Sequence, residues 1–300
     1  MLTADDLRFF MSITESPSLA AAARRLNVTP PAVTQRLRAL ELRLGVQLID
    51  RSTNSMTDEG ELLAERSRAI VEQIDDIGEL MVQRRGTVAG HLRISAPSGF
   101  GRAYLVPAVD RFIGLHPEVR VTLDLSDNPI GLKPDAWDVI IHIGELRSSP
   151  LQLVKLSPNR RLLCASPDYL ARHGAPAVPS ELLKHRCLGL RENDEDVTLW
   201  RLVAPGGSVE TVRVNPHVWS NDGEAIRELA VRGRGIILRS EWDIAPLLSS
   251  GALVEILPGW SAPDAPVVAL LGPRNYRAAR TRNFVEMLRQ MLTPTPWRAE

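Results

Sequence analysis

The segment from Ser18 to Gly45, SLAAAARRLNVTPPAVTQRLRALELRLG, restricts the fold of this chain more than any other stretch of its sequence. Ser18 is a favoured N-cap residue, and residues 19–26 are strong helix formers. Pro30 and Pro31 fit only the first turn of a helix, because an amide hydrogen at that place has no partner within the helix. The segment therefore predicts two short helices joined by a tight turn.

The second predicted helix, which Thr29 can cap, has two different faces. Apolar residues recur at helical spacing and predict a buried stripe: Val33, Leu37, Leu40 and Leu44. Thr34, Gln35 and Arg38 fall on the opposite face, and such polar side chains can hydrogen-bond base edges in the DNA major groove. Residues 24–51 hold six arginines and two acidic residues, which agrees modestly with a DNA partner. The alternative interpretation is a solvated helical hairpin.

The residues after Gly45 predict a small wing and then one long helix. Residues 46–56 fit a short β-wing in which Arg51 would face a DNA phosphate. Thr57 or Asp58 can cap a helix that runs to about residue 85. With Ser67 as a polar exception, its apolar residues form a coiled-coil seam: Leu63, Ile70, Ile74, Ile77 and Met81. We expect this seam to pair with a second copy of the chain; packing against its own domain is the alternative.

A different periodicity begins after residues 86–90, GTVAG, which predict a hinge. Short β-rich apolar runs follow, and residues 119–125 alternate between apolar and polar as in a half-buried strand. Helices are predicted between these runs, among them residues 223–232 and 276–292. The second part of the chain is therefore predicted to have an α/β fold.

Several motifs identify a family resemblance. AAARRLNVTPPAVTQRLRALELRLGVQLIDR, followed by MTDEG, resembles the N-terminal signature of LysR-type transcriptional regulators. RISAPSGFGRAYLVPAVDRFIGLHPEV, LLCASPDYLARHG and SNDGEAIRELAVRGRGI resemble the effector domain of one large subgroup of that family. Three positions depart from the pattern: Ile49 replaces a phenylalanine in what should be the domain core, His142 replaces a common arginine, and residues 131–137 differ from the usual acidic segment.

The resemblance implies three functional parts. These are an all-α winged helix-turn-helix domain at 1–57, a dimerising linker helix with a hinge at 58–90, and an α/β effector domain at 91–300. The effector domain would be two-lobed and similar to periplasmic solute-binding proteins, with 91–162 and 267–300 in lobe one and 163–266 in lobe two.

The same resemblance implies a regulator that binds double-stranded promoter DNA as a homodimer or homotetramer and is switched by a small-molecule effector. Together with the polar helix face, it gives a set of expected DNA contacts: Ser18, Thr29, Pro30, Pro31, Thr34, Gln35, Arg38 and Arg51.

Two predicted helix starts suggest the chemistry of the effector. Ser98 and residues 220–223 each precede a helix, so two helix N-termini with partial positive charge could point into an interlobe cleft. A small organic acid, aromatic acids included, would suit such a site, although these residues are also ordinary helix caps. The expected contacts are Ser98, Gly99, Phe100, Asn128, His142, Trp219 and Asn221. A histidine in place of arginine predicts a weaker hold on an anion.

Composition and charge argue against other classes of protein. The 300 residues, 44% hydrophobic and 24% charged, suit an ordinary globular protein of about two domains. Basic and acidic residues number 36 each, so DNA affinity must come from local patches and dimerisation. The chain begins without signal-peptide features and has no apolar run near the roughly 20 residues of a membrane span. We therefore expect a cytoplasmic protein rather than an exported solute carrier; an architectural DNA binder without an effector is a further alternative.

Catalytic residues are not evident. The six histidines lack metal-ligand spacing, and Cys164 lies in an apolar strand, where a buried inert thiol is expected rather than a nucleophile. Ser98 is not in the G-x-S-x-G pattern of a nucleophile elbow. The sequence therefore predicts no enzyme, no metal site and no cofactor.

Overall fold

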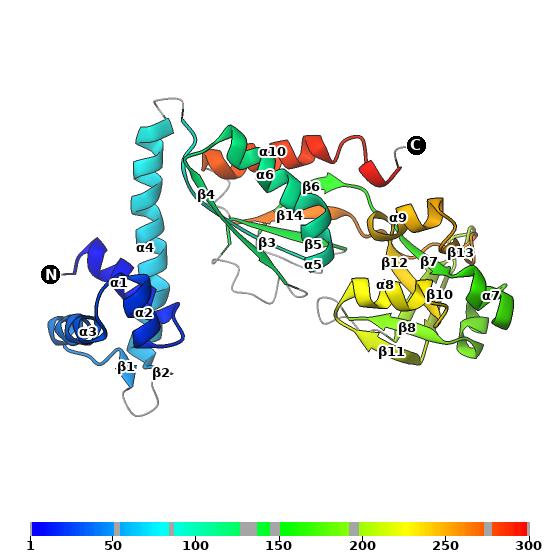
Figure 1. The fold of residues 1–300 in the computed structure, drawn as a ribbon, viewed down its shortest axis with the longest axis horizontal. Coiled ribbons are helices and arrows are strands. Elements are labelled where there is room, and N and C mark those ends of the chain that lie inside the picture. Colours follow the sequence, from blue (N-terminus) through cyan, green and yellow to red (C-terminus); the bar gives the residue numbers. More distant parts are fainter. Residues whose placement is uncertain are drawn as a thin grey trace. The chain divides into compact units, whose positions relative to one another are not determined.

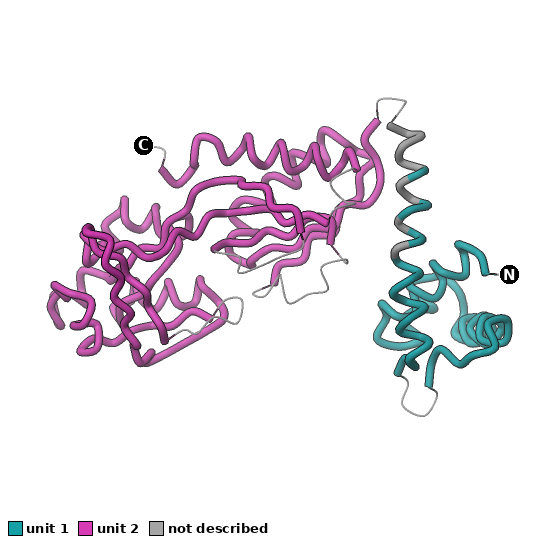
Figure 2. The backbone as a smooth tube through the Cα atoms, turned by 180° about the vertical axis from the view of Figure 1, so that it is seen from behind, with its two compact units in different colours: residues 1–86 teal, residues 87–300 magenta. Residues whose placement is uncertain are grey.

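The computed structural model describes residues 2–50, 55–83, 87–126, 137–144, 151–191, 198–272 and 278–298. The chain divides into two compact units, Met1–Gly86 and Thr87–Glu300 (Figure 2). The first unit is largely helical, and the second combines two five-stranded sheets with helices (Figure 1).

Four helices and a two-stranded wing make up unit 1: α1 (Ala4–Thr14), α2 (Leu19–Arg25), α3 (Pro30–Leu44), β1 (Ile49–Asp50), β2 (Ser55–Met56) and α4 (Asp58–Gln83). The predicted helix pair is confirmed. The Ser18 hydroxyl accepts a hydrogen bond from the amide of Ala21, which caps α2. Thr29 takes the extended N-cap conformation before α3 but forms no side-chain capping bond there. Gly45 ends α3 in the left-handed region, with φ of 71°.

The wing is anchored to the helices by one buried carboxylate. Glu41 of α3 accepts hydrogen bonds from the amides of Leu48 and Ile49, at 3.0 and 3.3 Å. Ile49 is buried in the unit 1 core, as expected for an apolar replacement. Gly60, in the first turn of α4, lies so close to the Leu48 carbonyl oxygen that a Cβ atom would be 2.1 Å from it. Only glycine therefore fits at this position.

Lobe one of unit 2 is a mixed sheet in the order β4-β3-β5-β14-β6. Its strands are β3 (Gly90–Ala96), β4 (Val119–Leu125), β5 (Val139–Ile143), β6 (Gln152–Ser157) and β14 (Val267–Leu271). Strand β3 is parallel to β4 and β5, whereas β14 is antiparallel to β5 and β6. After β3 the chain forms α5 (Ser98–Phe100), the π-helical segment η1 (Gly101–Leu105) and α6 (Val106–Leu115), and α6 packs beside α10 (Ala279–Met291) (Figure 1).

Lobe two is a second sheet in the order β11-β8-β12-β7-β13. Its strands are β7 (Arg161–Ala165), β8 (Cys187–Leu190), β11 (Pro216–Ser220), β12 (Ile236–Ser240) and β13 (Val254–Glu255). Helices α8 (Gly223–Val231) and α9 (Glu241–Ser249) pack on one side in one apolar cluster. A second cluster joins the other side to α7 (Pro167–His173), η3 (Pro179–Lys184) and the hairpin β9 (Leu199–Val203) and β10 (Val209–Arg213). The predicted lobe boundary at 162 falls inside β7.

Helix α9 belongs to the cores of both lobes. Trp242 and Ala245 pack in the lobe-one cluster, while Ile244 and Leu247 pack in a lobe-two cluster. The C-terminal turn η5 (Pro296–Arg298) contacts α9 as well. The lobes therefore share this helix as well as the connecting strands.

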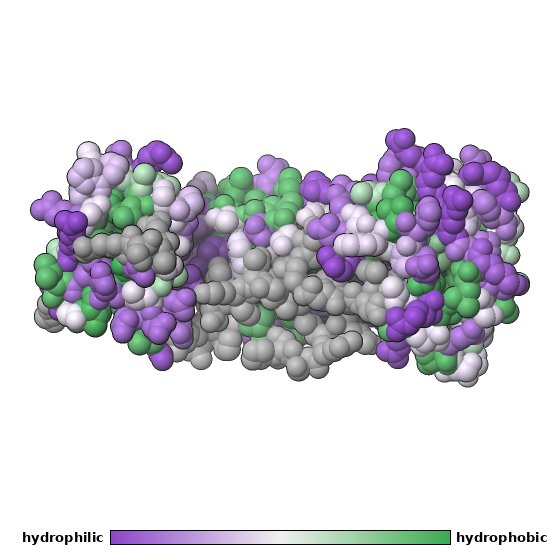
Figure 3. All heavy atoms as spheres, turned by 90° about the horizontal axis from the view of Figure 1, so that it is seen from below, coloured by the Kyte–Doolittle hydropathy of each residue, from purple (hydrophilic) through white to green (hydrophobic). Residues whose placement is uncertain are grey.

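The surface of the chain is mixed in polarity. On the face of lobe two drawn in Figure 3, hydrophilic residues predominate, with apolar patches between them. Among the described helices, none has the length and apolar composition needed to cross a bilayer.

Candidate DNA-binding surface and effector site

The polar face of α3 is accessible in unit 1. Val33, Leu37 and Leu40 are buried in the core, while Gln35 and Arg38 are exposed. Thr34 is half-buried and donates its hydroxyl hydrogen to the carbonyl oxygen of Pro30. The other predicted DNA contacts at the helix start, Thr29, Pro30 and Pro31, are exposed, and Arg51 lies outside the described residues.

Several arginines near this face already have structural partners. Arg36 pairs with Asp5 and its guanidinium carbon lies 4.3 Å from the centre of the Phe9 ring. Arg43 pairs with Asp6 of α1 at 2.6 Å. Burial alone would raise the pKa of Asp6, but hydrogen bonds from Thr3 and Arg43 outweigh it and lower that pKa. Because these cations hold α3 against α1, counting arginines overstates the charge available to DNA.

Helix α4 presents apolar residues on two sides. Leu63 is half-buried against the unit 1 core, and Ser67 and Val71 are buried. The exposed fractions of Ile70, Ile74 and Ile77 are 43%, 37% and 59%. The side chain of Met81 lies outside the described residues. Leu63 therefore matches the alternative of packing within its own domain, whereas the three isoleucines leave an apolar stripe uncovered in a single chain.

In unit 2, the start of α5 lies beside the first turn of α8. A Cβ atom on Gly99 would be 3.1 Å from Cη2 of Trp242 and 3.8 Å from Oε1 of Glu224. Ser98 and Gly99 are half-buried and Asn221 is exposed. Asp222, the neighbour of Asn221, caps α8 by accepting hydrogen bonds from the amides of Glu224 and Ala225 at 2.8 and 3.2 Å.

Two of the predicted effector contacts, Phe100 and His142, have buried side chains. Phe100 is fully buried, 4.9 Å from the ring of Tyr104 and 5.4 Å from that of Trp242. His142 is buried in β5, where it pairs with Val268 of β14. Neither side chain is exposed in this structure, Phe100 in the first helical turn after β3 and His142 within the central part of the sheet.

The remaining predicted contacts differ in their surroundings. Trp219 is 53% exposed on the outer strand β11, and the guanidinium of Arg191 lies over its ring at 4.4 Å. Asn128 lies outside the described residues.

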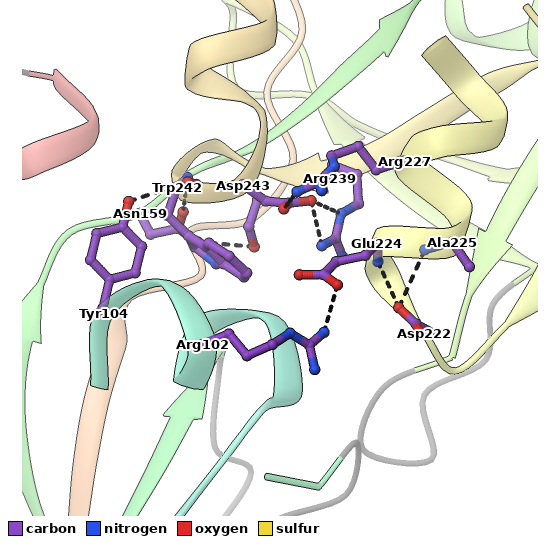
Figure 4. Close-up of polar contacts among 11 residues, drawn as sticks. Arg102, Tyr104, Asn159, Asp222, Glu224, Ala225, Arg227, Arg239, Trp242 and Asp243 are labelled. Carbon is purple, nitrogen blue, oxygen red and sulfur yellow. Dashed lines mark hydrogen bonds and ion pairs between the residues drawn. The ribbon is translucent and has the colours of Figure 1, made fainter. Parts of the chain in front are cut away.

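Charged residues that the sequence analysis missed surround the junction of α5 and α8 (Figure 4). Arg102 of η1 pairs with Glu224 of α8 at 2.6 Å. Behind them, the buried Asp243 of α9 accepts two hydrogen bonds from Arg239, at 2.8 and 2.6 Å, and pairs with Arg227. A Cβ atom on Gly223 would lie 2.4 Å from the Arg239 guanidinium, so a side chain at this position would have to displace that cation.

The cysteines have the surroundings of inert thiols. Burial raises the pKa of Cys164 and of Cys187 to about 12, which leaves both protonated at neutral pH. No cluster of three or more potential metal ligands occurs within the described ranges.

Comparisons with known proteins agree with this architecture. Residues 4–61 match the model for bacterial regulatory helix-turn-helix proteins of the lysR family, and residues 85–293 match the LysR substrate binding domain.

Curated relatives and solved structures cover almost the whole chain. The transcriptional activator TtdR of Escherichia coli K12 is 35% identical over 95% of this chain and 92% of its own length. The transcriptional regulator DmlR of the same strain is 34% identical over 95% and 93%. The full-length structure of the Vibrio cholerae virulence activator AphB has a TM-score of 0.63 at 25% identity, covering 96% and 98% of the two chains. The protein belongs to the LysR family of DNA-binding transcriptional regulators and is not an enzyme.

Proposed function

We propose that this regulator works in the cytoplasm as a homo-oligomer that binds promoter DNA and is switched by a small organic acid. The observation that carries the acid effector is the junction of α5 and α8, where Gly99 and Arg102 of lobe one both lie beside Glu224 in the first turn of α8. Ser98 and Asn221 are the sequence neighbours of this junction, and we keep them as predicted contacts. Carboxylates are among the anionic groups that guanidinium donors and helix N-termini recognise. Trp219 would border the site for acids that carry a ring.

The exposed face of α3 supports base reading in the DNA major groove. Gln35 and Arg38 point away from the core, and amide and guanidinium side chains form bidentate bonds with adenine and guanine. Thr34 would support them from the same turn, with Ser18, Thr29, Pro30 and Pro31 near the groove edge and Arg51 on a phosphate.

The uncovered stripe Ile70, Ile74 and Ile77 of α4 supports a dimer, with Met81 continuing the seam in sequence. An exposed apolar stripe of this kind is costly in a monomer. Two-fold pairing places two recognition helices about 34 Å, or a multiple of that distance, apart on the DNA. A dimer of such dimers would give the tetramer that the resemblance implies.

The DNA and effector functions can be tested together on DNA that flanks the protein's own gene. We expect protection of two half-sites, and a change in the protected length when the active organic acid is added. Gln35→Ala and Arg38→Ala should each weaken specific binding by about 1 to 3 kcal/mol and relax sequence preference. Arg289→Ala, which removes an exposed arginine in α10, is the control that should bind normally. Protection unaffected by Gln35→Ala and Arg38→Ala would contradict the assigned reading face.

The seam has its own test in the sedimentation of the full-length chain. Ile70→Glu combined with Ile77→Glu should dissociate the oligomer, because each substitution places a charge on the stripe. Gln73→Glu adds a charge to the exposed surface of α4 without removing an apolar side chain, and should leave the oligomer intact. An unchanged sedimentation coefficient for the double variant would show that the seam does not hold the oligomer.

A further inference from the structure

The Arg102–Glu224 ion pair joins the two lobes at their boundary. Arg102 lies in η1 of lobe one and Glu224 in the first turn of α8 in lobe two, 122 residues apart in the chain. Nη2 of Arg102 is 2.6 Å from Oε2 of Glu224, and their side chains are 49% and 38% exposed. The two side chains extend toward one another from the two lobes (Figure 4).

The surroundings hold each side of this pair in place separately. Asp222 caps α8 from within lobe two, and Gly223 rests on the buried Arg239, which Asp243 holds. On the side of lobe one, Gly99 and Tyr104 contact Trp242, the tyrosine hydroxyl donating to its carbonyl oxygen at 3.4 Å. Each helix therefore has further contacts that hold it when the Arg102–Glu224 pair separates, and the pair adds to them.

The pair is also easy to separate. Exposed ion pairs contribute little to stability, because water and salt solvate each partner almost as well. Glu224 released from Arg102 stays in the first turn of α8, where the helix dipole favours a negative charge. A carboxylate in solution can thus take its place at the guanidinium with two parallel hydrogen bonds.

We propose that Arg102 reads the carboxylate of the effector and that Glu224 is the internal competitor for the same guanidinium. The proposal rests on the organic-acid effector of the proposed function. It adds how these two residues would select an anionic effector over a neutral one. Without effector, Glu224 neutralises Arg102 and links the lobes. An anionic effector replaces Glu224 and breaks that link, whereas a neutral analogue cannot.

The test uses the full-length protein and a panel of succinate, glutarate, citrate and benzoate, with succinamide as the neutral analogue. The acid that most raises the melting temperature of the wild type is then titrated by calorimetry. Glu224→Gln should tighten its binding by up to about fivefold, the factor that corresponds to about 1 kcal/mol. Arg102→Gln should weaken it by about tenfold or more, because the acid loses its charged partner.

Glu228→Gln is the matched control. Glu228 pairs with Arg232 at 2.7 Å, on the same helix and in an exposed pair, but within lobe two. This variant should bind the acid as the wild type does. If Glu224→Gln and Arg102→Gln shift the affinity in the same direction, or if neither differs from Glu228→Gln, competition at Arg102 is refuted while the acid effector stands.

A measurement without ligand separates the two proposals. In amide hydrogen exchange, Arg102→Gln and Glu224→Gln should each speed exchange in residues 99–105 and 223–226 relative to Glu228→Gln. If no acid in the panel stabilises the wild type or Glu224→Gln, the organic-acid effector is overturned. Exchange then decides the link between the lobes: faster exchange in both variants supports it, and exchange equal to that of the control overturns it.

Discussion

Among the described residues, ion pairs link the lobes of unit 2 at two places, which differ in burial. Arg102 and Glu224 meet at the surface, whereas Glu241, at the start of α9, is 5% exposed and is held by two arginines. Arg298 contacts both its carboxylate oxygens, at 2.7 to 3.1 Å, and Arg160 contacts one at 2.7 Å. Water can solvate both partners of the first contact, while losing the arginines of the second would leave a buried carboxylate unpaired.

Aromatic packing strengthens the buried side of this comparison. The rings of Phe100, Tyr104, Trp242 and Trp297 contact one another, with centroids 4.9 to 6.4 Å apart. Trp297 immediately precedes Arg298, so the C-terminal turn contributes both a ring and a cation. The difference indicates that the lobes are fixed at α9 and adjustable at α8.

Removing the ring of Trp242 should cause the largest loss of stability. Trp242→Ala deletes a buried indole that contacts both Phe100 and Gly99, and should cost about 3 to 5 kcal/mol in urea unfolding of the full chain. Trp219→Ala removes an exposed indole, and should cost much less. Equal losses for the two variants would show that the cluster does not join the lobes.

Removing the buried charge of Glu241 should cause the next largest loss of stability. Glu241→Gln keeps the shape of the side chain but loses the charge-assisted bonds to Arg298 and Arg160, which should cost about 1.5 to 3 kcal/mol. Glu286→Gln is the comparison, because its pair with Arg289 is exposed on α10. The same small loss for both would remove the distinction between a buried and an exposed contact.

The contribution of the Glu241 charge to the stability of the wild type should be lost in acid. Burial alone would raise the pKa of Glu241, but hydrogen bonds from Arg298 and Arg160 outweigh it and hold the pKa below the ordinary 4.5. The stabilisation is therefore complete above the ordinary pKa and is lost as pH falls through the lowered one, since the unfolded chain binds the proton first. Unfolding free energies between about pH 6 and pH 3 should fall less steeply for Glu241→Gln than for the wild type. Parallel slopes would contradict this assignment.

The exposed pair should give the smallest effect. Glu224→Gln should change the unfolding free energy by less than about 1 kcal/mol. That difference should vanish in about 1 M NaCl, where the screening length is about 3 Å, whereas the Glu241→Gln difference should persist. A loss at Glu224 that survives high salt would place this pair in the same class as the Glu241 contact.

Local pattern was enough to predict unit 1 and many strands of unit 2. The spacing of Val33, Leu37 and Leu40 gives the buried face of α3, and α8 was predicted to within one residue at its end. These features depend on neighbours within one helix turn or one strand, so the sequence alone contains them. The short strands β8 to β11 and helices α7 and α9 were not predicted, because their apolar residues pack against distant segments.

Fewer features of the candidate effector site follow from local pattern, for the same reason. The helix start at Ser98 and the cap next to Asn221 follow from local rules, but Arg102 meets Glu224 only through the tertiary fold. The burial of Phe100 against Trp242 and of His142 beside β14 also depends on segments that are distant in the sequence. The arginine partners of Asp5 and Asp6 likewise join helices that are separate in sequence.

Because α9 packs in the cores of both lobes, it limits where segments of this protein can be exchanged with those of its relatives. A chimera that exchanges residues 163–266 as a block would bring a foreign α9 and place its side chains against the native Phe100 and Trp297. Such a graft separates residues that fill one core, and it should fold only if the partners of Trp242 and Glu241 are transplanted as well. Engineering a new sensor specificity is therefore better done by exchanging the whole of unit 2 than by exchanging one lobe.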